Sequence, residues 1–137
     1  MIFQHHPWFL KDAAEDDQYF NIPKARRTVF LELFRQAGVK YLFSGHYHRN
    51  AIARDGDIEA ITTGPVGKPL GEAKSGLRVV IVTDNGISHR YYELGELPAR
   101  VSINPPEVFP RDRDAMPAAR GSNRQGRQPP RESPLTK

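Results

Sequence analysis

The amino-acid composition of this 137-residue chain changes sharply near residue 97, and the change limits how much of the chain can fold. Residues 98–137 hold 8 of the 12 prolines, one aromatic residue, and 8 basic against 4 acidic side chains. A segment with so few large apolar residues cannot bury enough surface to offset the entropy lost on ordering. We therefore predict one folded unit over residues 1–97 and a disordered, basic, Pro- and Arg-rich tail over residues 98–137.

Composition excludes several classes of protein. Because the chain has no cysteine, it can form neither disulfides nor a cysteine-based zinc site. None of its apolar runs approaches the ~20 residues of a membrane helix. Its first residues have neither the positive charge nor the long apolar stretch of a signal peptide. We therefore expect a cytoplasmic protein without a membrane partner.

The net charge of +4 lies entirely in the tail, because residues 1–97 carry equal numbers of basic and acidic side chains. A basic tail can attract nucleic acid through its charge. This tail, however, has no aromatic residues interleaved with the basic ones and no RNA-binding motif. A solvated tail is therefore the favoured interpretation, and we expect no specific nucleic-acid partner.

The pattern of apolar residues predicts an α/β fold in the first 97 positions. Five short runs are typical of strands: residues 1–4, 39–43, 58–63, 77–83 and 87–93. Residues 23–37 show the spacing of an amphipathic helix between Pro23 and Gly38, with apolar side chains at Ala25, Val29, Phe30, Leu33, Phe34 and Ala37. The Asp84-Asn85-Gly86 turn indicates a β-hairpin. We expect a βαβ unit followed by antiparallel strands.

Four of the five histidines lie in two short segments, residues 5–7 (His-His-Pro) and residues 45–48 (Gly-His-Tyr-His), each directly after an apolar run. Ligand sites in α/β sheets form at the carboxyl ends of strands. One helical crossover should therefore bring both segments to the same edge of the sheet. Neutral imidazole is the commonest metal ligand in proteins, and it suits zinc and iron.

Either histidine segment alone is a weak signal, and a polar loop is then the simpler interpretation. Their order, their positions after strands and the single helix between them together favour a metal site formed by His5, His46 and His48. By itself His6 is better interpreted as a packing or substrate-side residue. His89 lies inside the last predicted strand, where we expect it to make a structural hydrogen bond.

These residues resemble the motifs of a known family. His5-x-Pro7 after one strand and Gly45-His46-x-His48 after the next resemble the last two metal-binding motifs of the calcineurin-like metallophosphoesterases. Further stretches are similar to a branch of that family described as serine/threonine phosphatases: residues 3–7, 16–23, 43–50, 76–80 and 89–92. The resemblance covers residues 1–97, and the tail shares none of it.

The resemblance implies a four-layer αββα sandwich and a two-metal phosphoesterase site holding Mn, Fe or Zn. In the family, the histidines at the positions of His5 and His46 bind one metal, and the histidine at the position of His48 binds the other. The expected reaction is in-line attack on phosphorus by a metal-bound water or hydroxide. Its substrate would be a phosphorylated protein or a small phosphoester. His6, Arg49 and Asn50 are expected on the substrate side.

Three family motifs, Asp-x-His, Gly-Asp-x-x-Asp and Gly-Asn-His, have no match in this sequence. The bridging carboxylate, the Asn ligand and the histidine that protonates the leaving group therefore have no counterpart, and we identify no catalytic residue. We expect the chain to correspond to the C-terminal half of such a phosphatase, with an incomplete metal site and no activity alone.

The alternative hypothesis is a catalytically dead remnant that acts as a binding or regulatory fragment. Under either hypothesis, strands that lack their neighbours should leave apolar surface exposed along the first strand and on the inner face of the sheet. We expect a patch larger than the ~300–600 Å² that is usual for a monomer, and self-association through it.

Overall fold

The computed structural model of this chain describes residues 1–103. The predicted disorder of the tail therefore falls almost entirely outside the described residues. Residues 98–103, which are described, are exposed, with 36% of Val101 and 75% of Ile103 accessible to solvent. The division of the chain at residue 97 stays a prediction.

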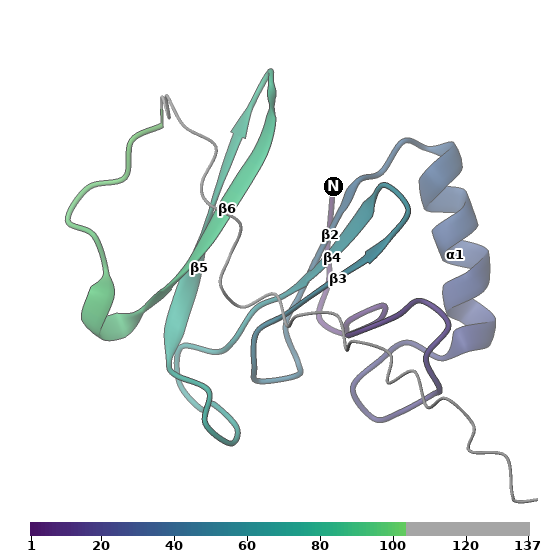
Figure 1. The fold of residues 1–137 in the computed structure, drawn as a ribbon, viewed down its shortest axis with the longest axis horizontal. Coiled ribbons are helices and arrows are strands. Elements are labelled where there is room, and N and C mark those ends of the chain that lie inside the picture. The colour runs from purple at the N-terminus through teal and green to yellow at the C-terminus, as the bar shows by residue number, and fades with distance from the viewer. Residues whose placement is uncertain (104–137) are drawn as a thin grey trace, which may run out of the picture.

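The described part is a mixed α/β structure with two sheets and a single α-helix (Figure 1). Its elements, in chain order, are β1 (Ile2–Phe3), α1 (Lys24–Gln36), β2 (Tyr41–Ser44), β3 (Ala51–Asp55), β4 (Ile58–Thr62), β5 (Gly76–Thr83), β6 (Gly86–Glu93) and a 3₁₀ turn (Leu94–Glu96). The larger sheet has the strand order β1-β2-β4-β3, and β5 and β6 form a separate two-stranded sheet. The predicted βαβ unit is confirmed, because β1 and β2 are parallel neighbours joined through α1.

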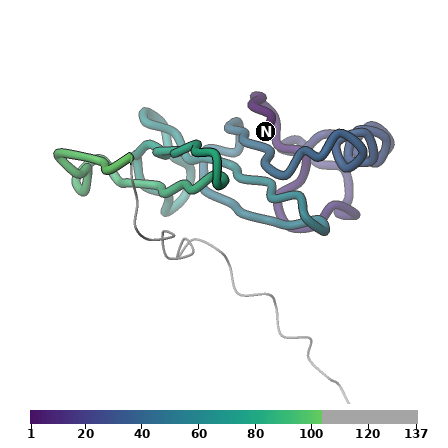
Figure 2. The backbone as a smooth tube through the Cα atoms, turned by 90° about the horizontal axis from the view of Figure 1, so that it is seen from above, coloured from purple at the N-terminus to yellow at the C-terminus, as the bar shows by residue number. Residues whose placement is uncertain are grey.

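The larger sheet is covered on both faces, so the described residues form three layers (Figures 1 and 2). Leu42 and Ala60 alternate with their neighbours to face α1, where they form a core with Leu31 of the helix. On the opposite face, Phe43 packs edge-on against His89 of β6, with ring centroids 5.7 Å apart. This alternation along each strand is the two-residue period of a sheet buried on both sides.

The sequence did not predict strand β3, so the prediction was wrong for residues 51–55. Its sequence, Ala-Ile-Ala-Arg-Asp, has only one large apolar residue and gives a weak strand signal. The missed signal is the turn that follows, Asp55-Gly56-Asp57. Gly56 has φ 58°, a left-handed conformation that favours glycine, and it closes the antiparallel β3–β4 hairpin.

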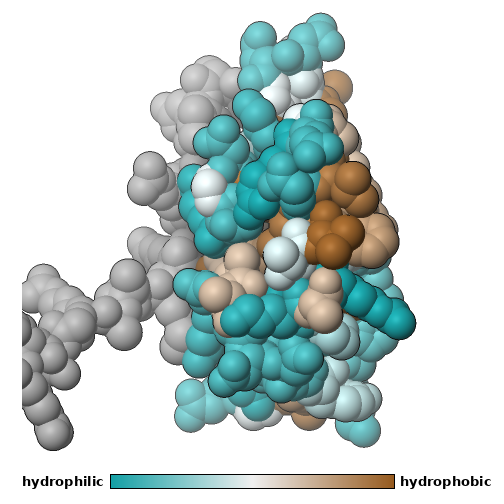
Figure 3. All heavy atoms as spheres, turned by 90° about the vertical axis from the view of Figure 1, so that its right-hand side faces the viewer, coloured by the Kyte–Doolittle hydropathy of each residue, from teal (hydrophilic) through white to brown (hydrophobic). Residues whose placement is uncertain are grey.

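The predicted apolar face of α1 is only partly the buried one. Leu31 and Arg27 point into the molecule, with 2% and 0% of their surface exposed, whereas Val29 and Leu33 are 59% and 50% exposed. Seen from the α1 side, the molecule shows hydrophobic surface beside hydrophilic surface (Figure 3). The buried face differs from the predicted one because Arg27 is buried, whereas the periodicity of apolar residues assigns an arginine to the surface.

Arg27 is buried because it holds the loop between β1 and α1 against the helix. Its guanidinium donates hydrogen bonds to the backbone carbonyls of Trp8 (3.2 Å), Ile22 (3.3 Å) and Glu15. The Glu15 carboxylate lies 3.9 Å away and supplies the opposite charge. A buried charge is tolerated only when it is paired and hydrogen-bonded in this way. Arg27 therefore fixes the loop that carries Tyr19 over the histidines.

Within residues 1–103, no helix is long and apolar enough to cross a membrane. The three described layers agree with part of a phosphoesterase domain. The fourth layer of the predicted αββα sandwich is not seen among these residues.

Candidate functional site

The register of β1 and β2 brings the two predicted histidine loops together. Phe3 pairs with Phe43, and the ladder continues past the strands through a hydrogen bond from the Gly45 N–H to the His5 carbonyl, at 3.0 Å. Both loops therefore leave the sheet at the same edge. Three histidines, His5, His46 and His48, were predicted to converge. Two of them do lie together, because His46 Nδ1 is 3.2 Å from His5 Nε2.

His6 joins this pair, although the sequence favoured a packing or substrate-side role for it. Its ring centroid lies 3.9 Å from that of His46 and 5.0 Å from that of His5. One ring nitrogen from each of the three histidines lies within 4.8 Å of the other two, so the group could hold a metal ion. Partial removal from water lowers the pKa of His6, and the neighbouring rings of His46 and His5 add to this shift.

A backbone carbonyl determines which nitrogen of His46 is available as a ligand. His46 Nε2 lies 3.3 Å from the carbonyl oxygen of Tyr19, which can only accept a hydrogen bond. Nε2 must therefore carry the proton, and Nδ1 is the basic nitrogen that faces His5. A second hydrogen bond of this kind orients metal-binding histidines in many proteins.

His48 is not part of the three-histidine group. Its Nδ1 lies 2.6 Å from the carbonyl oxygen of Lys68, so Nδ1 carries the proton and Nε2 is left as the basic nitrogen. Lys68 belongs to the turn-rich loop between β4 and β5. The role of His48 as a ligand for a second metal stays a prediction.

The backbone is strained at both histidines of the second loop. His46 and His48 have φ values of 61° and 56°, in the left-handed region that residues other than glycine rarely adopt. Such residues cost on the order of 1–3 kcal/mol each and gather at functional sites. Hydrogen bonds hold the strain in place, among them the one from the Leu70 N–H to the His48 carbonyl at 3.1 Å.

Arg49 and Asn50, the other two predicted substrate-side residues, point in different directions. Asn50 Oδ1 accepts hydrogen bonds from the Gly64 N–H at 3.0 Å and from Arg78 Nη2 at 3.1 Å. This amide oxygen therefore anchors the end of the histidine loop. Arg49 is exposed, and its guanidinium carbon lies 5.4 Å from the centre of the Tyr47 ring. The substrate-side role of Arg49 stays a prediction.

A charged network that the sequence did not reveal joins the two sheets. Arg78 of β5 donates to His89 Nδ1 at 2.9 Å, and His89 Nε2 donates to the Glu59 carboxylate at 3.2 Å. The hydrogen bond from His89 lowers the pKa of Glu59; burial opposes this shift, and the positive charge of Arg54 adds to it. The structural hydrogen bond expected for His89 is confirmed.

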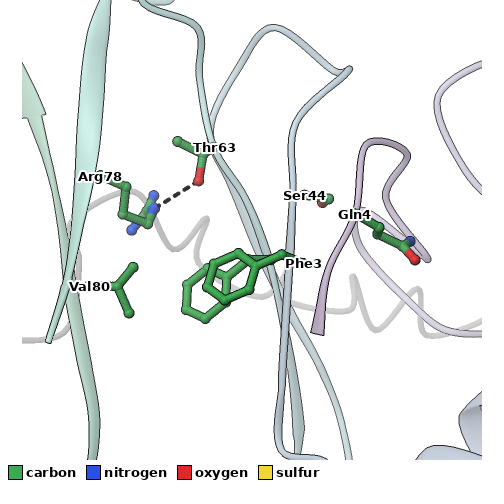
Figure 4. Close-up of a pocket in the computed structure, with 7 residues that line it drawn as sticks. Phe3, Gln4, Ser44, Thr63, Arg78 and Val80 are labelled. Atoms are coloured by element: carbon green, nitrogen blue, oxygen red, sulfur yellow. Dashed lines mark hydrogen bonds between the residues drawn. The ribbon is translucent and has the colours of Figure 1, made fainter. Parts of the chain in front are cut away.

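An open cleft of ≈190 Å³ lies between the larger sheet and β5 (Figure 4). Its lining is mainly apolar: Phe3, Gln4, Phe43, Ser44, Thr63, Arg78 and Val80. Phe3 stacks on Phe43 with ring centroids 4.9 Å apart, yet 64% of Phe3 is exposed. Met1, just before β1, is 49% exposed. Apolar side chains of the first strand are thus open to solvent, as predicted, whereas the predicted size of the patch stays untested.

Comparisons with known proteins identify relatives of the chain. No family model and no solved structure matches it. Among curated proteins it is 44% identical over 100 residues to a serine/threonine-protein phosphatase CPPED1 of Danio rerio, and 47% identical over 98 residues to that of Homo sapiens. The protein of the same name in Bos taurus is 47% identical over 97 residues.

These alignments cover 71–73% of the chain but only 31–32% of each relative. The chain therefore spans about a third of the length of the curated relatives that it matches. Over the matched stretch, this chain is a homologue of CPPED1, the calcineurin-like phosphoesterase domain-containing protein 1.

Proposed function

We propose that the chain contributes two metal-binding loops to a metal-dependent serine/threonine phosphatase of the calcineurin-like type. The observation that carries the proposal is the 3.2 Å separation of His46 Nδ1 and His5 Nε2. Two nitrogens bound at about 2.0–2.1 Å to one tetrahedral metal lie roughly 3.3–3.4 Å apart. The two loops therefore fit a shared metal ion. The relatives are named serine/threonine-protein phosphatases, and this supports the proposed activity.

The three imidazoles supply part of the donor set that this proposal requires. His5 Nε2 and His46 Nδ1 would hold one metal, and His48 Nε2 would face a second one. A bound metal pair activates a water molecule and stabilises the attacking and leaving oxygens of a phosphoester. The Tyr19 and Lys68 carbonyls would keep the imidazoles in the required tautomers, since each accepts the proton on the nitrogen that does not bind metal.

The substrate in this proposal is a phosphorylated protein or a small phosphoester. Arg49 is an exposed cation directly after His48, and its guanidinium is suited to paired contacts with phosphate oxygens. The histidines at this edge are themselves exposed or half-buried, so a large substrate can approach.

We further propose that the protein is cytoplasmic and that the intact domain is a four-layer sandwich. We propose neither a membrane partner nor a specific nucleic-acid partner.

A second candidate function is a non-catalytic binding or regulatory role. The observation in its favour is the exposed apolar edge at β1, where Phe3 is 64% exposed next to an open cleft. Unpaired strands at a sheet edge attract other chains. This candidate predicts association without hydrolysis.

A chimeric phosphatase tests the proposal. In the bovine relative, the matching 97 residues are replaced by the corresponding part of this chain. We expect the chimera to hydrolyse p-nitrophenyl phosphate and a phosphoserine peptide with added Mn²⁺, and this chain alone to hydrolyse neither. His5→Ala or His46→Ala should reduce activity of the chimera by about 10²-fold or more, whereas Glu72→Gln, at an exposed loop position, should not.

A folded chimera that binds metal but does not hydrolyse either substrate would contradict the phosphatase proposal and favour the binding role. Full activity of the His5→Ala chimera would show that these loops do not hold the metal.

A further inference from the structure

We propose that His5, His6 and His46 form a mononuclear site for a divalent first-row metal such as Zn²⁺, with His6 rather than His48 as the third ligand. The proposal rests on the proposed function only in sharing His5 and His46. It concerns what the chain binds by itself, so it requires no phosphatase activity.

The local backbone explains why two consecutive histidines can serve one metal. In an extended strand, neighbouring side chains point to opposite faces. Here β1 ends at Phe3, and His5 and His6 lie in a bend, so their rings meet edge to face with centroids 5.0 Å apart. The Gln4 side chain donates a hydrogen bond to the His6 carbonyl and thereby supports the bend.

The distances are close to those of a three-histidine site. All three donor nitrogens lie within 4.8 Å of one another, and the pair from His5 and His46 is already at 3.2 Å. A tetrahedral metal requires roughly 3.3–3.4 Å between neighbouring ligands. His5 and His6 are exposed, so small side-chain rotations can close the remaining gap without disturbing the core. Three imidazoles and one open position are a ligand set that zinc readily adopts.

Different backbone carbonyls hold His46 and His48, and they keep His48 apart from the three-histidine site. The carbonyl oxygen of Tyr19 accepts a hydrogen bond from His46 Nε2 and leaves Nδ1 facing His5 Nε2. The rings of Tyr19 and Phe20 lie 5.0 and 5.8 Å from that of His46. The Lys68 carbonyl holds His48 through Nδ1, outside the group of three.

Metal titration of the purified 137-residue chain tests the proposal. Zn²⁺ binding is measured by calorimetry, and Co²⁺ binding by its visible absorption bands, whose intensity reports coordination geometry. We expect one equivalent of metal per chain and tetrahedral Co²⁺ bands. His6→Ala and His6→Gln should each weaken binding by about tenfold or more. Glu72→Gln, at an exposed loop position, is the control and should change binding less than about twofold.

Circular dichroism of each variant shows whether the fold is kept; His6 is exposed, so its replacement should leave the fold intact. No binding by the parent chain, or binding that depends on His48 but not on His6, would overturn the proposal. The two proposals can fail separately. If the chimera is active but the 137-residue chain binds metal without needing His6, only the mononuclear site is refuted. If metal binding by the chain depends on His6 but the chimera is inactive, only the phosphatase proposal is refuted.

Discussion

At the scale of single residues, backbone carbonyls rather than carboxylates orient His46 and His48. Tyr19 supplies the carbonyl that accepts from His46, and Lys68 supplies the one that accepts from His48. A carbonyl oxygen cannot donate, so each contact selects one tautomer without adding charge. Glu59 is different, because its carboxylate accepts from His89 between the two sheets. Carbonyls therefore act at the candidate metal site, and a carboxylate acts in the packing between layers.

Glu59 should make the stability of the chain depend on pH in acid. Its pKa is lowered in the folded state from an ordinary value of 4.5, so the ionised carboxylate stabilises the fold at higher pH. This contribution should be complete above about pH 4.5 and be lost as the pH falls through the folded pKa. Glu59→Gln should reduce the free energy of unfolding by about 1–3 kcal/mol at pH 7.

Urea denaturation at a series of pH values measures this effect. The difference between parent and Glu59→Gln should shrink as the pH falls below about 4.5. Glu72→Gln, at an exposed loop position, is the matched control and should show no such difference. A constant difference from pH 7 to pH 3 would contradict the role given to the Glu59 charge.

At the scale of elements, short connections place the site. The parallel β1–β2 pair directs the His5 and His46 loops to one edge, and the β3–β4 hairpin returns the chain beside β2. The β5–β6 sheet then reaches back across the larger sheet, where Arg78 bonds to Thr63 at 3.2 Å and to Asn50 at 3.1 Å. One arginine thus links β5 to the end of the histidine loop and to the end of β4.

Gly76, at the start of β5, should tolerate no side chain. A Cβ at this position would overlap the backbone carbonyl oxygen of Tyr92 and would lie 2.6 Å from the Tyr91 ring. Overpacking of this kind typically costs about 1–3 kcal/mol. Gly76→Ala should therefore lower the thermal unfolding midpoint, whereas Gly95→Ala, with no heavy atom within 4 Å of the added carbon, should not. Equal melting of the two variants would show that the β5–β6 packing is looser than described.

At the scale of the whole molecule, three layers are stacked and one edge is open. The helix covers one face of the larger sheet and β5–β6 covers part of the other (Figures 1 and 2). The cleft between the sheets opens at β1, where Phe3 and Met1 are exposed. Exposed apolar clusters of this kind mark surfaces that associate with other protein surfaces.

Self-association through this edge is the expected consequence. In sedimentation experiments the chain should form oligomers at micromolar concentration and should bind the apolar dye ANS. Phe3→Glu should reduce both effects several-fold, because a charge at the edge strand opposes pairing. Val66→Glu, which changes an equally exposed apolar residue in a loop, is the control and should leave association unchanged. A monomer at all concentrations would contradict the expectation.

Local sequence alone determined several features of this chain. The helix and all described strands except β3 follow, in approximate position, from periodicity and turn residues. The convergence of His5 with His46 follows from the rule that ligands gather at strand ends. Each of these features depends on residues close in sequence or on a single crossover connection, so it can be predicted without knowledge of tertiary contacts.

Tertiary structure alone decided the rest. The bend that turns His6 toward His46, the carbonyl partners of both loop histidines, and the burial of Arg27 depend on backbone positions far apart in sequence. Periodicity assigns a lone arginine to the surface and consecutive residues to opposite faces, because it carries no information about which carbonyl lies nearby. Only the packed chain brings those oxygens within hydrogen-bond distance, and each contact selects the tautomer of one histidine.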